Sequence, residues 1–293
     1  MIGAWRQPIV LLVSLAMVLP LEFVAAAQQP TFSARVAAVR VDVSVTRRGT
    51  VVSGLRPEDF EVRDNGVLQK VDLAIFEQLP LNVHLALDLS HSVSGERLRD
   101  VKTAGQAVLD GLTQRDKASL LTFNQAVSLR EPLTPDLGRV RSALEAAEAS
   151  GDTSLYDATY AAMPSGKADA ARDLMLVFSD GRDRASWLSA QTVLQSARRA
   201  DVVIYGLSLR GSSSSRFLAA LGAATGGEAF EVDTTRNLRS RFLRILNEFR
   251  ERYLVSYSPQ GVQRGGWHKL DVKIGGQGGT VRARPGYFDR DER

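Results

Sequence analysis

The chain has 293 residues, contains no cysteine and carries a formal net charge of +4. Its length suits about two domains, and the absence of cysteine excludes disulfides, thiolate metal sites, cysteine nucleophiles and a lipid-modified amino-terminal cysteine. The hydrophobic fraction of 44% and the charged fraction of 24% are ordinary for a globular protein, which argues against a disordered chain and against a membrane-embedded bundle.

Residues 1–27 are typical of a Sec-type signal peptide. Arg6 supplies the positive region, the run from Ile9 to Leu19 is apolar, and three alanines form a small-residue cleavage site. The apolar run is too short for a comfortable membrane span. We therefore expect an exported bacterial protein, periplasmic or secreted, with no integral membrane span after cleavage. Uncleaved anchoring is the alternative, because Glu22 is unusual in a cleavage region.

Residues 28–80 are expected to form an amino-terminal β segment. Apolar and polar residues alternate from Val39 to Thr46, the period of a half-exposed strand. Asn65-Gly66, between residues 61–63 and residues 67–71, predicts a hairpin, since Asn and Gly accept positive φ at low cost. This segment has too few strands to be stable alone.

Residues 253–293 are the expected partner of that segment. A strand-like run extends from Tyr253 to Ser258, and Leu270, Val272 and Ile274 alternate with charged residues. Both ends of the chain therefore carry antiparallel patterns, and we expect them to pack together as a small accessory antiparallel β module.

Residues 81–252 alternate between strand and helix patterns. We expect strands ending at Asp88 and Asp180, further strands over 119–123, 202–207 and 229–232, an edge strand over 127–133, and helices over 98–112, 135–149, 154 onwards, 189–200, 216–224 and 238–253. Strands separated by helices predict a doubly wound, mostly parallel sheet with right-handed crossovers and helices on both faces. The edge strand would be antiparallel, since Arg130 and Pro132 suit a sheet margin.

The most informative stretch is an uncharged apolar run that stops at Asp88 and is followed by Ser90 and Ser92. Such a run fits a central strand buried on both faces, and ligands bind beyond the carboxyl ends of parallel strands. One carboxylate and two hydroxyls are hard oxygen ligands, which suit Mg²⁺, Mn²⁺ or Ca²⁺ and suit zinc or copper poorly.

Two later stretches add oxygens. Thr153 lies in a loop that opens a helix, and a second uncharged apolar run ends at Ser179-Asp180-Gly181. At these positions the chain resembles the von Willebrand factor type A (VWA) domain, whose metal-ion-dependent adhesion site (MIDAS) combines Asp-x-Ser-x-Ser, a threonine and a later aspartate. The order of strands and helices is also similar over about 170 residues, which implies a Rossmann-like fold.

The resemblance implies a metal site made of Asp88, Ser90, Ser92, Thr153 and Asp180. Mg²⁺ is the ion we expect, with Mn²⁺ and Ca²⁺ as alternatives. A competing interpretation is that the first three residues only cap the following helix and that the last only turns the chain, since both patterns are ordinary local structures.

The family's usual role implies metal-dependent binding of a protein ligand, whose Glu or Asp carboxylate completes the coordination of the ion. Arg182, Arg184 and Trp187 follow the last site residue and are candidate partner-binding residues. The alternative for these three is two solvated charges and a packed tryptophan.

Two other functions remain open. One is a structural envelope component with an idle metal site, and the other is a metal-dependent hydrolase. A hydrolase needs a general base and a substrate pocket, and the chain offers only His84, His91 and His268, with no Gly-x-Ser-x-Gly, phosphate-binding glycine loop or His-Glu-x-x-His. We therefore do not expect an enzyme.

Nucleic acid is not an expected partner. The densest group of arginines is predicted to lie on the last helix and consists of Arg236, Arg239, Arg241, Arg244, Arg250 and Arg252. No recognised nucleic-acid motif accompanies it, so we interpret the group as a solvated helix face.

Overall fold

The computed structural model describes residues 38–76, 79–164, 171–276 and 278–289. The predicted signal peptide therefore lies outside the described residues. Within these ranges, no helix is both long enough and apolar enough to cross a membrane.

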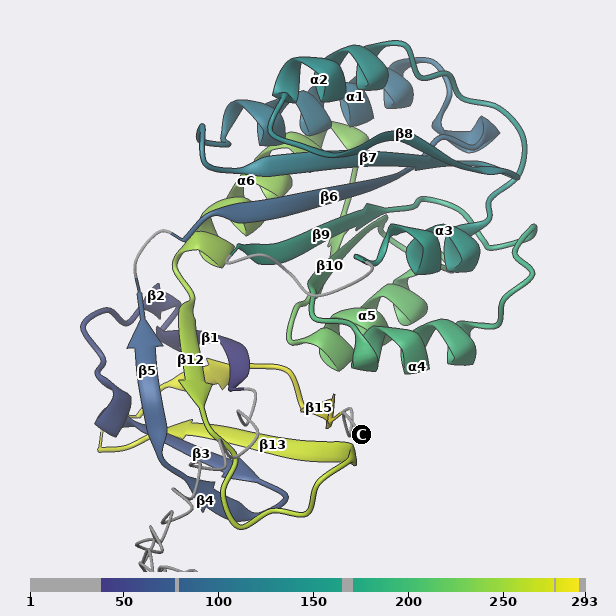
Figure 1. Ribbon diagram of the computed structural model, residues 1–293. Helices are drawn as coiled ribbons and strands as arrows, with labels where there is room; N and C mark the ends of the chain where they lie inside the picture. Colours follow the sequence, from purple (N-terminus) through teal and green to yellow (C-terminus); the bar gives the residue numbers. More distant parts are fainter. Residues whose placement is uncertain (1–37, 77–78, 165–170, 277, 290–293) are drawn as a thin grey trace, which may run out of the picture. The chain divides into compact units, whose positions relative to one another are not determined.

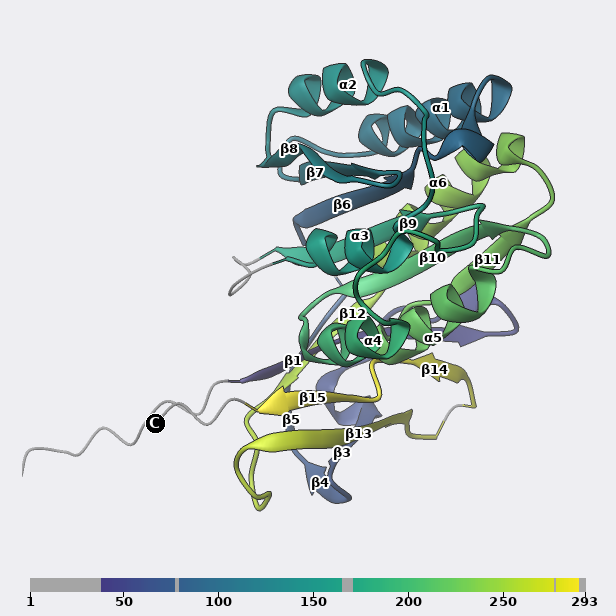
Figure 2. The same cartoon turned by 90° about the vertical axis from the view of Figure 1, so that its right-hand side faces the viewer.

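The main sheet has the strand order β11-β10-β9-β6-β7-β8 (Figure 1 and Figure 2). The strands β6, β7, β9, β10 and β11 run parallel to one another, and β8 runs antiparallel to β7. The bounds are β6 (Leu81–Asp88), β7 (Lys117–Phe123), β8 (Val127–Thr134), β9 (Arg172–Phe178), β10 (Val203–Leu209) and β11 (Ala229–Val232). The expected antiparallel edge strand is thus confirmed.

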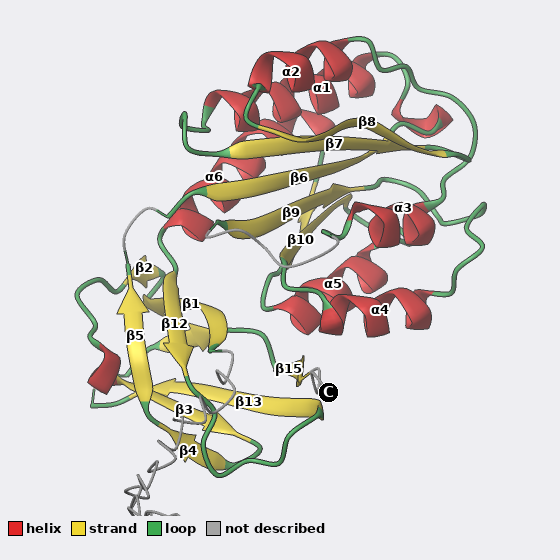
Figure 3. Cartoon of the chain, in the orientation of Figure 1, coloured by secondary structure: helices red, strands yellow, loops and turns green. Residues whose placement is uncertain are grey.

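Helices cover both faces of this sheet (Figure 3). One face packs against α1 (Glu96–Asp110), α2 (Leu137–Glu145) and α6 (Leu238–Arg250), and the other against α3 (Leu155–Ala162), α4 (Ala190–Arg199) and α5 (Ser215–Thr225). Burial on both faces explains why β6 is uncharged before its end. Leu85 packs into the apolar core on the side of α1, α2 and α6, and Ala86 packs into the core on the side of α3, α4 and α5. A strand buried on both sides has no place for a charge before its end. The predicted doubly wound α/β fold is confirmed.

The strand order fixes where a ligand can bind. The chain runs from β6 outward through β7 to β8, returns to β9 beside β6, and continues outward through β10 to β11. The direction of winding therefore reverses between β6 and β9. In open α/β sheets, ligands bind at this switch point beyond the carboxyl ends of the strands.

The accessory module consists of antiparallel strands from both ends of the chain (Figure 2). One sheet has the order β14-β1-β12-β5, with β2 paired to β1, and the other has the order β15-β13-β3-β4. The bounds are β1 (Val39–Arg47), β2 (Thr50–Val51), β3 (Phe60–Asp64), β4 (Val67–Gln69), β5 (Val71–Ile75), β12 (Tyr253–Tyr257), β13 (Gly266–Ile274), β14 (Thr280–Arg282) and β15 (Gly286–Asp289).

The two ends pair directly. Val41 lies opposite Val255, and Val62 lies opposite Val272. The inward residues of both sheets form one apolar core in which Tyr253 is fully buried. The alternating valines of the first strand supply this core while their polar neighbours face outward.

Several sequence-based boundaries differ from the structure; for example, the helix expected to end at residue 149 ends at Glu145. The predicted hairpin forms, but its second arm ends at Gln69, and Val71 opens a separate strand that pairs with β12 in the other sheet. Tyr253 belongs to β12 rather than to the last helix, which ends at Arg250. The helix expected from residue 135 begins at Leu137, because the carboxylate of Asp136 accepts hydrogen bonds from the first free amides and caps it.

Arg172 links the α/β domain to the accessory module. It is the first residue of β9, its Nε forms an ion pair of 2.5 Å with Asp42 of β1, and its Nη2 donates a hydrogen bond of 2.9 Å to the carbonyl of Phe249. The side chain is almost completely buried. Removing one member of a buried ion pair leaves an unpaired charge, which is strongly destabilising, so this contact ties the end of α6 to the first strand of the module.

Candidate metal centre

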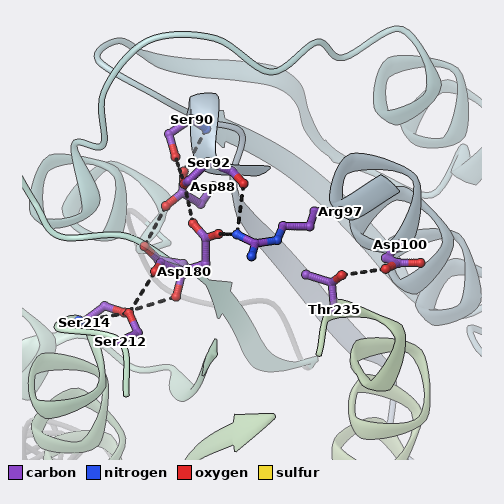
Figure 4. Close-up of polar contacts among 10 residues, drawn as sticks. Asp88, Ser90, Ser92, Arg97, Asp100, Asp180, Ser212, Ser214 and Thr235 are labelled. Carbon is purple, nitrogen blue, oxygen red and sulfur yellow. Dashed lines mark hydrogen bonds and ion pairs between the residues drawn. The ribbon is translucent and has the colours of Figure 1, made fainter. Parts of the chain in front are cut away.

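The two aspartates of the predicted site lie on neighbouring strands at the switch point. Asp88 is the last residue of β6, and Asp180 follows the end of β9 by two positions. The strands pair in parallel, with Leu87 opposite Phe178. Parallel strands present their carboxyl ends at one edge of the sheet, so both carboxylates reach the same side of the domain (Figure 4).

Asp88 is fully buried and held on both oxygens. Its Oδ1 accepts a hydrogen bond of 2.9 Å from the backbone amide of Ser90, and its Oδ2 accepts one of 2.6 Å from the hydroxyl of Ser179. Desolvation raises the pKa of Asp88 from its ordinary value of 3.8 to about 6, although these hydrogen bonds oppose the rise. The negative charge of Asp180 adds a smaller increase. The carboxylate is therefore costly to ionise without a nearby cation.

The two serines of the motif contact each other and not a helix end. Their hydroxyl oxygens lie 3.0 Å apart, and the hydroxyl of Ser92 donates a hydrogen bond of 2.6 Å to Oδ1 of Asp180. The first residue before α1 is Gly95, at φ 66°, and neither it nor Ser90 makes a side-chain cap. The helix-capping interpretation of these serines is therefore wrong.

Thr153 joins the same cluster from the middle loop. Its side chain is buried, and its carbonyl accepts hydrogen bonds from the amides of Arg184 and Ala185 at 2.9 and 3.1 Å. Gly181 shows how close the parts lie: a Cβ built there would be 2.9 Å from Oγ1 of Thr153 and 3.9 Å from Oδ2 of Asp88. The hydroxyl of Thr153 and the carboxylate of Asp88 therefore both lie close to Gly181, where a larger residue would crowd them.

Arg97, at the start of α1, is a member of the cluster that sequence reasoning missed. Its Nη1 lies 3.1 Å from Oδ2 of Asp180 and donates a hydrogen bond of 3.2 Å to the carbonyl of Ser92. The arginine side chain is 51% exposed, whereas that of the aspartate is 1% exposed. Asp180 is therefore engaged on both oxygens, and its interpretation as a simple turn residue is wrong.

A second pair of serines supports the backbone of the cluster. Ser212 donates a hydrogen bond to the carbonyl of Asp180 at 3.0 Å, and Ser214 donates one to the carbonyl of Ser179 at 3.1 Å. The two hydroxyls also lie 2.7 Å apart. The signal for them in the sequence is the run of four serines that leads into α5, but nothing in that run indicates which carbonyls their hydroxyls reach.

The loop after Asp180 is firmly braced and carries an exposed aromatic side chain. Trp187 is 96% exposed, while its amide donates a hydrogen bond of 2.9 Å to Asp157 of α3. Asp183 accepts further hydrogen bonds from the hydroxyl of Ser186 and the amide of Tyr156. The alternative of a packed tryptophan is therefore wrong. Arg182 and Arg184 are exposed on the same loop.

The histidines serve other contacts. His84 is buried in β6, with Nδ1 2.9 Å from Ser119 and Nε2 2.9 Å from Asp173. His268 is buried in the accessory module, 2.8 Å from Asp64. His91 is exposed, and its backbone amide donates to the carbonyl of Gly151.

The arginines of the last helix are not one solvated face. Arg252, just after the helix, is fully buried and donates to the carbonyl of Gly226 and the hydroxyl of Tyr205. Arg250 forms an ion pair of 2.7 Å with the buried Asp116. The sequence-based interpretation was wrong for these two, because their long side chains turn back into the fold. Arg241 and Arg244 line a cavity of about 340 Å³ beside β11.

The donor set fits a hard divalent cation. It consists of the carboxylates of Asp88 and Asp180 and the hydroxyls of Ser90, Ser92 and Thr153, and all of these are oxygens. No group of three His, Cys, Asp or Glu residues suited to a metal occurs in the part of the chain that the structure describes. A site at this position would therefore depend on neutral hydroxyls as much as on charge.

Fold and cluster together define a doubly wound α/β domain with an oxygen-rich centre at its switch point. The model of the von Willebrand factor type A domain matches residues 82–243. This match covers more than half of the chain, and the protein therefore belongs to the VWA family. Domains of this family are generally interaction modules rather than enzymes, and they often mediate metal-dependent protein binding.

Solved structures show the same fold at low sequence identity. A von Willebrand factor type A protein from Catenulispora acidiphila matches with a TM-score of 0.52 at 12% identity, over 87% of this chain and 75% of that one. Proximal thread matrix protein 1 from the mussel byssus, with a zinc-occupied MIDAS motif, matches with a TM-score of 0.54 at 11% identity, over 64% of this chain and 49% of that one. This chain thus spans about half of the mussel protein chain. The comparison with curated proteins gives no match.

Proposed function

We propose that this protein is a non-enzymatic, metal-ion-dependent protein-binding domain that acts at the cell envelope. The observation that carries the proposal is the convergence of Asp88, Ser90, Ser92, Thr153 and Asp180 at the switch point of a VWA fold. Family membership supports the kind of function, and the contacts among these residues support the choice of site.

The residues that would hold the ion contribute two negative charges and three neutral hydroxyls. When bound, the divalent cation supplies an electrophilic centre that accepts an oxygen ligand from outside the domain. The neutral hydroxyls leave part of its charge uncompensated, and a Glu or Asp side chain of a protein partner is the ligand that compensates it best. Mg²⁺ is the proposed ion, with Mn²⁺ or Ca²⁺ as alternatives. Zinc also requires testing, because it occupies the motif of the mussel protein.

The proposed partner surface includes Trp187, Arg182 and Arg184 beside the metal residues. An aromatic side chain that is 96% exposed on a braced loop presents a large apolar area at little cost in conformational entropy. The two arginines favour an acidic partner. Tryptophan and arginine are also the residue types that most often dominate binding energy at protein interfaces.

The proposed cellular setting follows from the sequence. Residues 1–27 are proposed to be a cleaved Sec-type signal peptide, which would deliver the mature protein to the periplasm or the outside of the cell. We further propose a VWA domain over residues 81–252 between β segments over 28–80 and 253–293. The antiparallel pairing of β1 with β12 supports this arrangement.

Calorimetric titration tests the site. Mg²⁺, Mn²⁺, Ca²⁺ and Zn²⁺ are titrated into the purified protein and into Asp88→Ala and Asp180→Ala, each with and without millimolar acetate as a surrogate for a partner carboxylate. We expect weak binding that acetate strengthens and that both variants lose. A folded protein that responds to no ion, even with acetate, would refute the adhesion mechanism and leave the fold unaffected.

Retention of a partner from a cell-envelope fraction tests the function. The protein is immobilised with Mg²⁺ or with a chelator, and Asp88→Ala serves as the metal-free control. Retention that requires both the ion and Asp88 supports adhesion. Equal retention under all conditions would instead favour a structural role with an idle site, and turnover of ester, phosphate or peptide substrates would favour a hydrolase.

A further inference from the structure

The metal centre contains a cation of its own. The guanidinium of Arg97 lies 3.1 Å from Oδ2 of Asp180 and 3.2 Å from the carbonyl of Ser92, so it contacts two residues of the motif at once (Figure 4). Both contacts come from the same nitrogen, Nη1. This places a permanent positive charge against the carboxylate that would attract a divalent ion.

The contact between Arg97 and Asp180 reduces the net negative charge of the proposed metal site. Asp88 and Asp180 together supply two negative charges, and Arg97 compensates one of them. The side chain of Asp180 is 1% exposed, so water screens this pair less than it screens a surface ion pair. A bare divalent ion that approaches the cluster therefore meets a smaller net attraction and a repulsive neighbour. An anionic ligand that approaches the same place is attracted by that neighbour.

The geometry also allows Arg97 to leave Asp180. Arg97 lies in the first turn of α1, its side chain is 51% exposed, and its guanidinium is held by one nitrogen. Arginine has several further donors in a planar fork that suits a carboxylate. The side chain can therefore turn from Asp180 toward an incoming carboxylate without a change in the backbone.

We propose that Arg97 is a built-in counter-cation that lowers the affinity of the site for a bare divalent ion and makes retention of the ion depend on the arrival of an anionic ligand. This inference rests on the proposed metal site and adds a residue that sets its affinity for the ion. A domain of this kind holds its ion firmly only while a partner carboxylate is present.

The test compares Mg²⁺ binding in the wild-type protein, Arg97→Met and Arg99→Ala, each titrated calorimetrically with and without acetate. The methionine variant keeps most of the side-chain volume and removes the charge. Arg99 is exposed on the same helix, so its variant removes an equal charge away from Asp180. We expect Arg97→Met to bind Mg²⁺ about tenfold more tightly than wild type without acetate, and to gain less affinity when acetate is added. Arg99→Ala should match wild type.

The outcomes separate this inference from the proposed function. If wild type and both variants are folded by circular dichroism and none responds to Mg²⁺, the metal site itself fails. If wild type binds Mg²⁺ and Arg97→Met binds it equally or more weakly, only the role of Arg97 is overturned. Equal strengthening in Arg97→Met and Arg99→Ala would show a general effect of net charge and would also overturn it.

Discussion

The burial of Asp88 predicts that the metal-free protein is destabilised by its own carboxylate at neutral pH. The change that tests this is Asp88→Asn, which keeps the shape of the side chain and removes its charge. The asparagine oxygen can still accept from the amide of Ser90, and its amide group can donate to the hydroxyl of Ser179. Both contacts of the native carboxylate at 2.9 and 2.6 Å therefore have neutral counterparts.

The magnitude follows from the pKa. In the folded protein, burial raises the pKa of Asp88 from 3.8 to about 6, so the native state retains a proton over a range of pH in which the unfolded chain has lost it. The stability that this group contributes is fully present below pH 3.8 and is lost as pH rises through about 6. Ionisation then costs about 3 kcal/mol.

Asp88→Asn has no charge to bury, so it avoids the cost of ionisation, but it loses the charge-assisted hydrogen bonds of the carboxylate. We expect Asp88→Asn to exceed wild type by about 2 kcal/mol in free energy of unfolding at pH 7.5 with a chelator, which is a rise of roughly 3 to 4 °C in Tm for a chain of this size. The difference should shrink steadily between pH 7 and pH 4. Millimolar Mg²⁺ should stabilise wild type alone and reduce or reverse the difference.

Thermal denaturation followed by circular dichroism, at several pH values and with chelator or Mg²⁺, measures these effects. Asp152→Asn is the control, since it removes one negative charge from an exposed position in the neighbouring loop. The reasoning would be refuted if Asp88→Asn were less stable than wild type at pH 7.5 with chelator. A gain that did not change with pH would refute it as well.

Three further predictions concern single substitutions, two beside the proposed metal centre and one in the buried core. Gly181→Ala places a Cβ 2.9 Å from Oγ1 of Thr153, so we expect Mg²⁺ affinity measured by calorimetry to fall about tenfold with little change in Tm. Arg252→Met leaves the buried hydroxyl of Tyr205 without the donor that now lies 2.6 Å away, and should lower the free energy of unfolding in urea by about 3 kcal/mol. Trp187→Ala should change stability by less than about 0.5 kcal/mol, since the side chain is 96% exposed, and should abolish metal-dependent retention of a partner.

Each of these has a contrary result that would count against it. Unchanged Mg²⁺ affinity in Gly181→Ala would exclude Thr153 from the site. A urea midpoint for Arg252→Met equal to that of wild type would mean that its buried contacts add nothing. Undiminished retention by Trp187→Ala would remove the exposed loop from the partner surface.

The sequence predicts those parts of the fold that depend on periodicity. Asp88 and Asp180 can be located because each ends an uncharged run, and a strand buried on both faces admits no charge before its edge. The antiparallel margin at β8 can be anticipated because Pro132 cannot donate to a ladder in the middle of a sheet. These signals are local, and they are strong because burial leaves few alternatives.

Contacts made by the ends of long side chains cannot be predicted from periodicity. Arg97 and Arg252 both occur in stretches that look solvated, yet one reaches Asp180 and the other turns into the core. Periodicity gives the direction of a Cα–Cβ bond and not the position of a guanidinium several bonds away. The division between β4 and β5 was also missed, because adjacent residues there join different sheets.

The interleaved strands of the accessory module have a consequence for the order of folding. β12 lies between β1 and β5, and the hydroxyl of Tyr253 donates to the carbonyl of Val52, 201 positions earlier. β1 and β5 are synthesised early, but β12, the strand that joins them, is synthesised only near the end of the chain. Closing so long a loop is slow in an unfolded chain.

Folding of the α/β domain shortens the loop that must close before β12 can pair with β1. Leu81 at the start of this domain lies opposite Arg172, whose guanidinium holds the carbonyl of Phe249 near its end. The long loop then becomes a short connection, and β12 is delivered beside β1. We therefore expect the central domain to fold first and to act as a template, so that the first strands synthesised are among the last to be ordered.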